Sequence, residues 1–135
     1  MLIYVHDSSS KYHERALNWW LSKVHGKEQL GIPWVVALGF VRLLSNNKVT
    51  DNPQRPEILL DIISEILTLP TVKTVVPGMR HSGLMKELFI ESGGTSRLTT
   101  DIHLAALAIE LDAVLASNDV DFSRFSRLKQ TNPLK

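Results

Sequence analysis

The chain has 135 residues, of which 44% are hydrophobic and 21% charged, and its formal net charge is +1. This composition is ordinary for a folded globular protein and excludes a disordered chain. The length fits one domain with a hydrophobic core of its own. The charge excludes a uniformly basic surface but is compatible with a local basic rim. Because there is no cysteine, disulfides and thiolate zinc sites are excluded.

Signals for membrane insertion or export are absent from the sequence. No apolar stretch approaches the roughly 20 residues that a membrane-spanning helix needs. The start, Met1 to Asp7, lacks the basic leader and long apolar segment of a signal peptide. We therefore expect a cytoplasmic protein without a membrane partner.

The first half of the chain predicts short strands and longer helices. Residues 2–5 are rich in strand-forming side chains and predict a strand that starts abruptly at the initiator. An amphipathic helix is predicted over 12–24 and a second strand over 30–32. The helix predicted over 34–44 is apolar nearly all round, so we expect it to be buried. A further helix opens at Pro56, since proline suits the first turn of a helix.

The second half continues the alternation. Its predicted elements are a strand over 71–76, a helix over 81–91 that stops at Gly93-Gly94, an Ala-rich helix after Asp101, a strand over 113–116 and a last strand near 128–130. Strands that alternate with helices predict a three-layer α/β/α fold with a mainly parallel central sheet. We expect it to form a single domain over residues 1–135.

Two aspartate neighbourhoods near the C-terminus are the most informative feature. Asp101 stands at the start of the Ala-rich helix, and Asp119 and Asp121 follow the strand predicted over 113–116. In an α/β sheet, helix N-termini and strand C-termini open on the same edge, where ligands bind. Carboxylates that converge there form a site for Mg²⁺ or Mn²⁺, which prefer oxygen ligands.

Each candidate also has a plainer interpretation. Asp101 alone is more often a helix-start acid that complements the helix dipole, and Asp119 and Asp121 alone are mostly turn residues. Ser117 either orients an acid or a water, or bonds to the backbone at a strand end. Arg42 is a candidate phosphate contact, but a solvated helix arginine is the commoner case.

Other polar and aromatic residues carry weaker signals. Arg97 and Lys86 are weaker phosphate contacts than Arg42. The histidines lack the spacing of zinc ligands and are interpreted as surface or satisfied residues; they are His6, His13, His25, His81 and His103. There is no nucleophile-elbow motif and no phosphate-binding glycine loop.

Several phrases, in their order and spacing, resemble the PIN-domain family, most closely the VapC-type toxins of bacterial toxin–antitoxin pairs. The phrases are Ile32-Pro33-Trp34-Val35-Val36, Phe40-Val41-Arg42-Leu43-Leu44-Ser45-Asn46, Asp101-Ile102-His103-Leu104-Ala105-Ala106-Leu107-Ala108 and Ser117-Asn118-Asp119-Val120-Asp121-Phe122, followed by Arg124-Phe125 and Asn132-Pro133-Leu134. The resemblance implies a Mg²⁺- or Mn²⁺-dependent endoribonuclease that cleaves RNA phosphodiesters. It also implies a homodimer, inhibited by an antitoxin that occupies the active-site groove.

The metal pocket of this family is built from four acidic positions. Asp101 matches the third and Asp119 the fourth, with Asp121 as an accessory acid. The first position falls ahead of Met1, so we expect the first strand to be truncated at its N-terminal end. The second falls at Gly39, where the family has a glutamate. We expect the reduced set of carboxylates to bind Mg²⁺ or Mn²⁺ weakly.

Two functions therefore stay open at this point. The chain is either a VapC-type endoribonuclease or a PIN-fold binding module that holds RNA or an antitoxin without cutting. Gly39 and the missing upstream aspartate favour the second. One hypothesis for Gly39 is a selected or engineered loss of function, because an active RNA-cutting toxin harms its host. An unrelated small-molecule α/β protein is a weaker third reading, since no nucleotide fingerprint is present.

Overall fold

Buried apolar side chains gather into two separate cores, one formed by residues of the first half together with Leu134 and one formed by residues 84–128. The computed structural model describes all 135 residues. They form two units, Met1–Val75 with Leu134, and Val76–Pro133 with Lys135. Each unit has a two-stranded parallel sheet, which confirms the prediction of an α/β class with parallel strands. The single-domain organisation stays a prediction. No helix has the length and apolar character required to cross a membrane.

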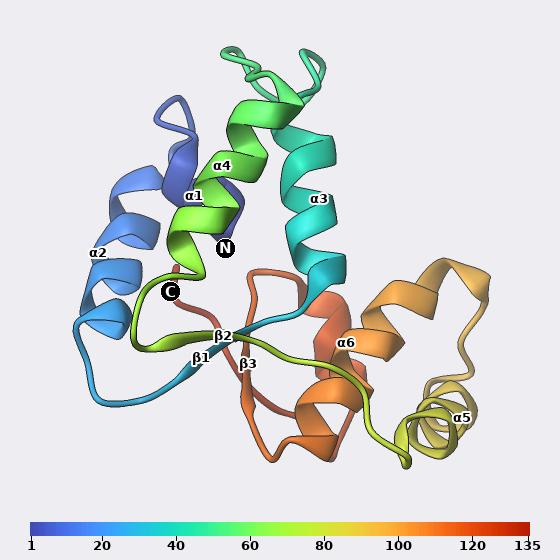
Figure 1. Ribbon diagram of the computed structural model, residues 1–135. Helices are drawn as coiled ribbons and strands as arrows, with labels where there is room; N and C mark the ends of the chain where they lie inside the picture. Colours follow the sequence, from blue (N-terminus) through green and yellow to red (C-terminus); the bar gives the residue numbers. More distant parts are fainter. The chain divides into compact units, whose positions relative to one another are not determined.

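The first unit is mostly helical. Its elements are α1 (Leu2–His6), α2 (His13–Val24), β1 (Leu30–Ile32), α3 (Trp34–Leu44), α4 (Pro56–Ile66) and β2 (Val72–Thr74). The helix α1 packs on α2, and α3 packs on α4 (Figure 1). Strands β1 and β2 pair in register, with Leu30 opposite Val72 and Ile32 opposite Thr74. The predicted helices of this unit are confirmed, and so are the strands predicted over 30–32 and 71–76.

The strand predicted over residues 2–5 is wrong, because this segment is helix α1. Leu2 and Val5 are both buried, and a separation of three residues places them on one helical face, whereas in a strand they would point to opposite sides. The His6 ring packs edge-on against the buried Phe40, with 5.2 Å between ring centroids. These packing contacts outweigh the strand preference of four residues, which is weak and depends on context.

The expectation that α3 is buried is correct for one face only. Ala37, Phe40 and Leu44 belong to the core. Trp34 and Leu38, one turn apart, are 48% and 57% exposed. Because the sequence is apolar on all sides of this helix, it does not show which face is covered. The exposed pair is an apolar strip on α3.

The second unit carries the acidic residues. Its elements are α5 (His81–Ser92), the 3₁₀ helix η1 (Ser96–Leu98), α6 (Thr99–Glu110), β3 (Val114–Ala116), the 3₁₀ helix η2 (Val120–Arg124) and β4 (Lys129–Thr131). Helix α5 packs on α6, and β3 pairs with β4 from Val114 opposite Lys129 to Ala116 opposite Thr131. Helix α5 ends where predicted, since Gly93 adopts a left-handed conformation with φ of 59°.

Two glycines allow a paired test of this fold. Gly39 lies inside α3, and a Cβ added there meets no atom within 4 Å. Gly39→Ala is therefore expected to raise the free energy of unfolding by about 0.5–1 kcal/mol, because alanine loses less backbone entropy in a helix. Gly93→Ala is expected to lower it by about 1 kcal/mol, because its φ is positive. Urea unfolding of both variants measures the two changes in the free energy of unfolding. Changes of the same sign would contradict the helical conformation of Gly39 or the left-handed conformation of Gly93.

Candidate metal centre

Buried neighbours in the sequence hold Asp101 in place. Leu98 and Ile102, on either side of it, are 2% and 0% exposed and belong to the core of the second unit. Asp101 lies in the first turn of α6 and is only partly buried. No side chain caps this helix, and the Asp101 carboxylate has no hydrogen-bond or ion-pair partner. The residue therefore complements the helix dipole without capping a backbone N–H group, and its oxygens are available to a ligand.

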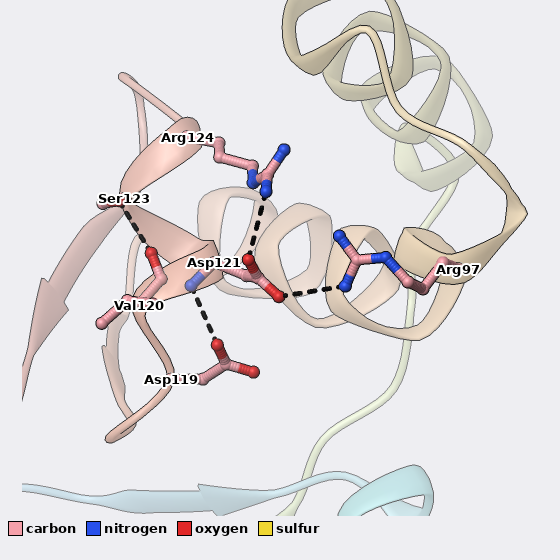
Figure 2. Close-up of polar contacts among 6 residues, drawn as sticks. All are labelled: Arg97, Asp119, Val120, Asp121, Ser123 and Arg124. Carbon is pink, nitrogen blue, oxygen red and sulfur yellow. Dashed lines mark hydrogen bonds and ion pairs between the residues drawn. The ribbon is translucent and has the colours of Figure 1, made fainter.

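The turn after β3 fixes the other two acids. The Ser117 hydroxyl oxygen accepts a hydrogen bond from the Asp119 backbone N–H at 3.0 Å. In turn, Oδ1 of Asp119 accepts from the Asp121 N–H at 2.8 Å and caps η2 (Figure 2). The next residue, Phe122, is buried in the core. The plainer interpretations, a Ser117 hydroxyl that bonds the backbone at a strand end and Asp119 as a turn residue, are thus confirmed. Oδ2 of Asp119 stays free of these turn bonds.

The structure brings the three carboxylates together, as their places at a helix start and a strand end predicted. Asp101, Asp119 and Asp121 each offer one oxygen, and these oxygens all lie within 4.8 Å of one another. Around Mg²⁺, metal–oxygen distances of about 2.1 Å allow opposite ligands to lie about 4.2 Å apart. Small side-chain rotations, or water between ligand and ion, close the difference. The donor set is all oxygen and fits Mg²⁺ or Mn²⁺.

The environment of Asp101 disfavours its charged form. Burial raises the pKa of this carboxyl above its ordinary value, and the negative charges of Asp119 and Asp121 raise it further. The positive charge of Arg97 opposes them with a smaller effect. A cation among the three acids would remove both causes of this cost, because it replaces lost hydration and screens the repulsion.

Asp121 differs from the other two acids because two arginines contact it. Nη1 of Arg97 lies 3.4 Å from its Oδ2, and Nη2 of Arg124 lies 3.3 Å from its Oδ1 (Figure 2). Arg97 comes from η1 and Arg124 from the end of η2. Both oxygens of Asp121 therefore face a guanidinium group, whereas Asp101 has no such partner.

The remaining predicted site residues, Arg42 and Gly39, belong to α3 of the first unit. Arg42 is exposed, and Gly39 has open space around the position of a Cβ atom. A glutamate side chain at position 39 would therefore meet no steric obstacle at its Cβ. The roles predicted for both residues stay predictions.

Two histidines form a contact that the sequence did not predict. Nε2 of His81 in α5 lies 2.8 Å from Nδ1 of His103 in α6, and the rings meet edge to face. The other ring nitrogen of His81, Nδ1, is buried and has no hydrogen-bond partner. Burial, and secondly the nearby His81, lower the pKa of His103. The two residues are 22 positions apart, so no local spacing marks the pair.

Comparisons with known proteins agree on one family. The profile of the PIN domain matches residues 1–128. Ribonuclease VapC33 of Mycobacterium tuberculosis is 35% identical over 135 residues, which is all of this chain and 94% of that protein. Ribonuclease VapC37 of the same organism is 31% identical over 133 residues, covering 98% and 92% of the two chains.

Solved structures show the same fold. VapBC-1 from nontypeable Haemophilus influenzae superposes with a TM-score of 0.67 at 18% identity, over 99% of this chain and 93% of that one. VapBC2 from Rickettsia felis, bound to a DNA fragment from its promoter, gives a TM-score of 0.61 at 18% identity, over 96% and 91% of the two chains. The comparisons therefore confirm the fold that the sequence phrases implied.

The raised pKa of Asp101 gives a stability test. In the folded chain this carboxyl holds its proton more tightly than in the unfolded chain, so its contribution to stability falls as pH rises from its ordinary pKa through the raised one. In the presence of a chelator, Asp101→Asn is therefore expected to melt at a higher temperature than the parent at neutral pH, and the gain should shrink near pH 4. Scanning calorimetry at both pH values measures the difference.

Added Mn²⁺ completes this test. Mn²⁺ should raise the melting temperature of the parent chain more than that of Asp101→Asn, because binding to the folded state stabilises it. Asp61→Asn, which alters an exposed acid on α4, is the matched control and should behave like the parent. A less stable Asp101→Asn at neutral pH, with an unchanged response to Mn²⁺, would contradict the assignment.

Proposed function

We propose that this chain, which belongs to the PIN-domain family, is a metal-dependent endoribonuclease of the VapC toxin type. The observation that carries the proposal is the cluster of three carboxylates, whose oxygens lie within 4.8 Å of one another. Curated relatives that match nearly the whole chain are named ribonucleases. The substrate class is RNA and the reaction is hydrolysis of a phosphodiester.

Asp101 and Asp119 are the proposed metal ligands. Both have a carboxylate oxygen that no hydrogen bond or ion pair occupies, and both are fixed by the backbone of a helix start or a turn. Mg²⁺ or Mn²⁺, when bound, supplies Lewis-acid stabilisation of the charge that develops on the phosphate oxygens. Asp121 is the accessory acid of the cluster.

The side chains of the site have a direct part in the hydrolysis. The oxygen of a water forms a bond to phosphorus in line with the leaving ribose oxygen, whose bond to phosphorus breaks. Asp101 and Asp119 orient that water by accepting its hydrogen bonds. The proton that the water loses would pass to a carboxylate of the cluster, and Asp101 is the candidate because no hydrogen bond or ion pair occupies its oxygens.

The rival function is a PIN-fold module that binds without turnover. Two observations favour it: position 39 is glycine, and both oxygens of Asp121 face arginines. Either feature reduces the number of carboxylates that hold a cation. In this case the chain binds RNA or an antitoxin without cutting it. The variant Gly39→Glu would then supply the glutamate that the family has at this position.

A cleavage assay separates the two functions. The parent chain is expected to cut a labelled RNA with Mg²⁺ or Mn²⁺ and to stop in a chelator. Asp101→Asn and Asp119→Asn are each expected to cut at least about 100-fold more slowly, the effect of losing a group that stabilises transition-state charge. Asp61→Asn is the control and should cut like the parent.

The same assay includes Gly39→Glu. Cleavage by Gly39→Glu and not by the parent would establish that the native site is impaired. RNA binding without cleavage by any of these chains would favour the binding module and overturn the proposed hydrolysis.

We also propose that the chain forms a homodimer and binds an antitoxin in the cytoplasm. The apolar strip on α3, Trp34 and Leu38, supports an interface, because exposed apolar patches generally mark sites of association. The chain also shares its fold with the solved VapBC-1 and VapBC2 structures.

Sedimentation tests the homodimer. The parent chain at high micromolar concentration is expected to sediment as a dimer, and the double variant Trp34→Ser/Leu38→Ser as a monomer. The control Ile90→Ser alters another exposed apolar side chain, on α5, and should sediment like the parent. A monomeric parent chain would contradict the homodimer.

A further inference from the structure

The arginines beside Asp121 carry more positive charge than that residue neutralises. Two guanidinium groups, from Arg97 and Arg124, contact one carboxylate, one at each of its oxygens (Figure 2). The other salt bridges of the chain join a single basic residue to a single acidic one. The Asp121 cluster therefore keeps one positive charge in excess over its own carboxylate.

The donors of these arginines are mostly unused. A guanidinium group has five N–H donors, and each arginine uses one contact, at 3.4 and 3.3 Å. Both side chains are open to solvent, with exposed fractions of 66% for Arg97 and 44% for Arg124. The Asp121 side chain, at 24%, is more buried than either. The guanidinium N–H groups of both arginines are thus held beside the Asp121 carboxylate and remain accessible to a ligand from solution.

The position of the pair points to a phosphate. Asp121 lies within 4.8 Å of the Asp101 and Asp119 carboxylate oxygens, so its arginines flank the cluster proposed to hold the metal. A phosphodiester cannot approach three carboxylates closely without positive charge beside them. Arginine is suited to this task, because its planar fork matches two phosphate oxygens at once.

We propose that Arg97 and Arg124 bind the backbone phosphates of a single-stranded RNA at this site, and that Asp121 acts as the positioning residue that holds both guanidinium groups there. The inference rests on the proposed function for its substrate class. It assigns phosphate binding to Arg97, which the sequence ranked below Arg42, and to Arg124, and it gives Asp121 a role distinct from those of Asp101 and Asp119.

Fluorescence anisotropy with a labelled ten-nucleotide RNA, in a chelator and over a range of salt concentrations, tests the inference on the full chain. Arg97→Gln/Arg124→Gln is expected to weaken binding at least about tenfold. It should also flatten the slope of log affinity against log salt by about 1.4, because each phosphate contact on a single strand contributes about 0.7. Arg127→Gln is the matched control, since Arg127 is similarly exposed but pairs with Glu87, and it should keep the parent slope.

Asp121→Asn separates a positioning role from a metal-binding one. It keeps both arginines charged but removes the charge that anchors them, so the RNA affinity should fall while the salt slope stays near that of the parent, and calorimetry should still detect Mn²⁺ binding. If the double arginine variant instead keeps the parent affinity and slope while Asp121→Asn abolishes Mn²⁺ binding, the arginines only neutralise a metal ligand and the inference is overturned.

The outcomes also separate this inference from the proposed function. A parent chain that cleaves RNA, with a double arginine variant that binds RNA unchanged, overturns the inference and leaves the ribonuclease intact. An arginine-dependent salt slope in a chain that never cleaves supports the inference and overturns the hydrolysis. A parent chain that does not bind the RNA in any salt overturns the inference.

Discussion

Repulsion among three carboxylates is the constraint on which the site depends. Ile102 and Phe122 lie in one buried cluster, and each is the immediate neighbour of an acid, Asp101 or Asp121. Burial of these apolar side chains fixes the two backbones, so the acids cannot separate without exposing part of the core. Burial raises the pKa of Asp101, and the charges of Asp119 and Asp121 raise it further. The fold thus maintains a local excess of negative charge, which a divalent cation would offset.

The protein compensates this charge unequally. Asp121 is flanked by Arg97 and Arg124, and Oδ1 of Asp119 is engaged by a backbone N–H, whereas Asp101 has neither kind of partner. The three acids are therefore not equivalent ligands. At one end of the cluster, Asp101 on α6 is unpaired and partly buried. At the other end, Asp121 on η2 contacts two arginines. Such a gradient would suit a cation beside Asp101 and an anionic phosphate beside the arginines, the arrangement that the proposed hydrolysis of a phosphodiester requires.

The sequence predicted those features that depend on local chemistry. Pro56 and Gly93 mark a helix start and a helix end, and the acids at a helix start and after a strand converge as expected. The sequence failed to predict elements whose conformation depends on packing. Residues 2–5 are an example, because burial of Leu2 and Val5 favours a helix there. The contacts of Arg97 with Asp121 and of His81 with His103 join residues separated by 24 and 22 positions, so only the folded chain brings them together.

Packing and chemistry offer different explanations for the glycine at position 39. Glycine in a helix costs about 1 kcal/mol relative to alanine. A close neighbour can account for a glycine, as in strand β1, where a Cβ at Gly31 would lie 2.9 Å from Val75. Apart from its chain neighbours and the backbone of its own helix, no atom lies within 4 Å of a Cβ at position 39, so the steric explanation does not apply. The consequence of glycine there is therefore a missing side chain, and Gly39→Glu would add one negative charge to α3.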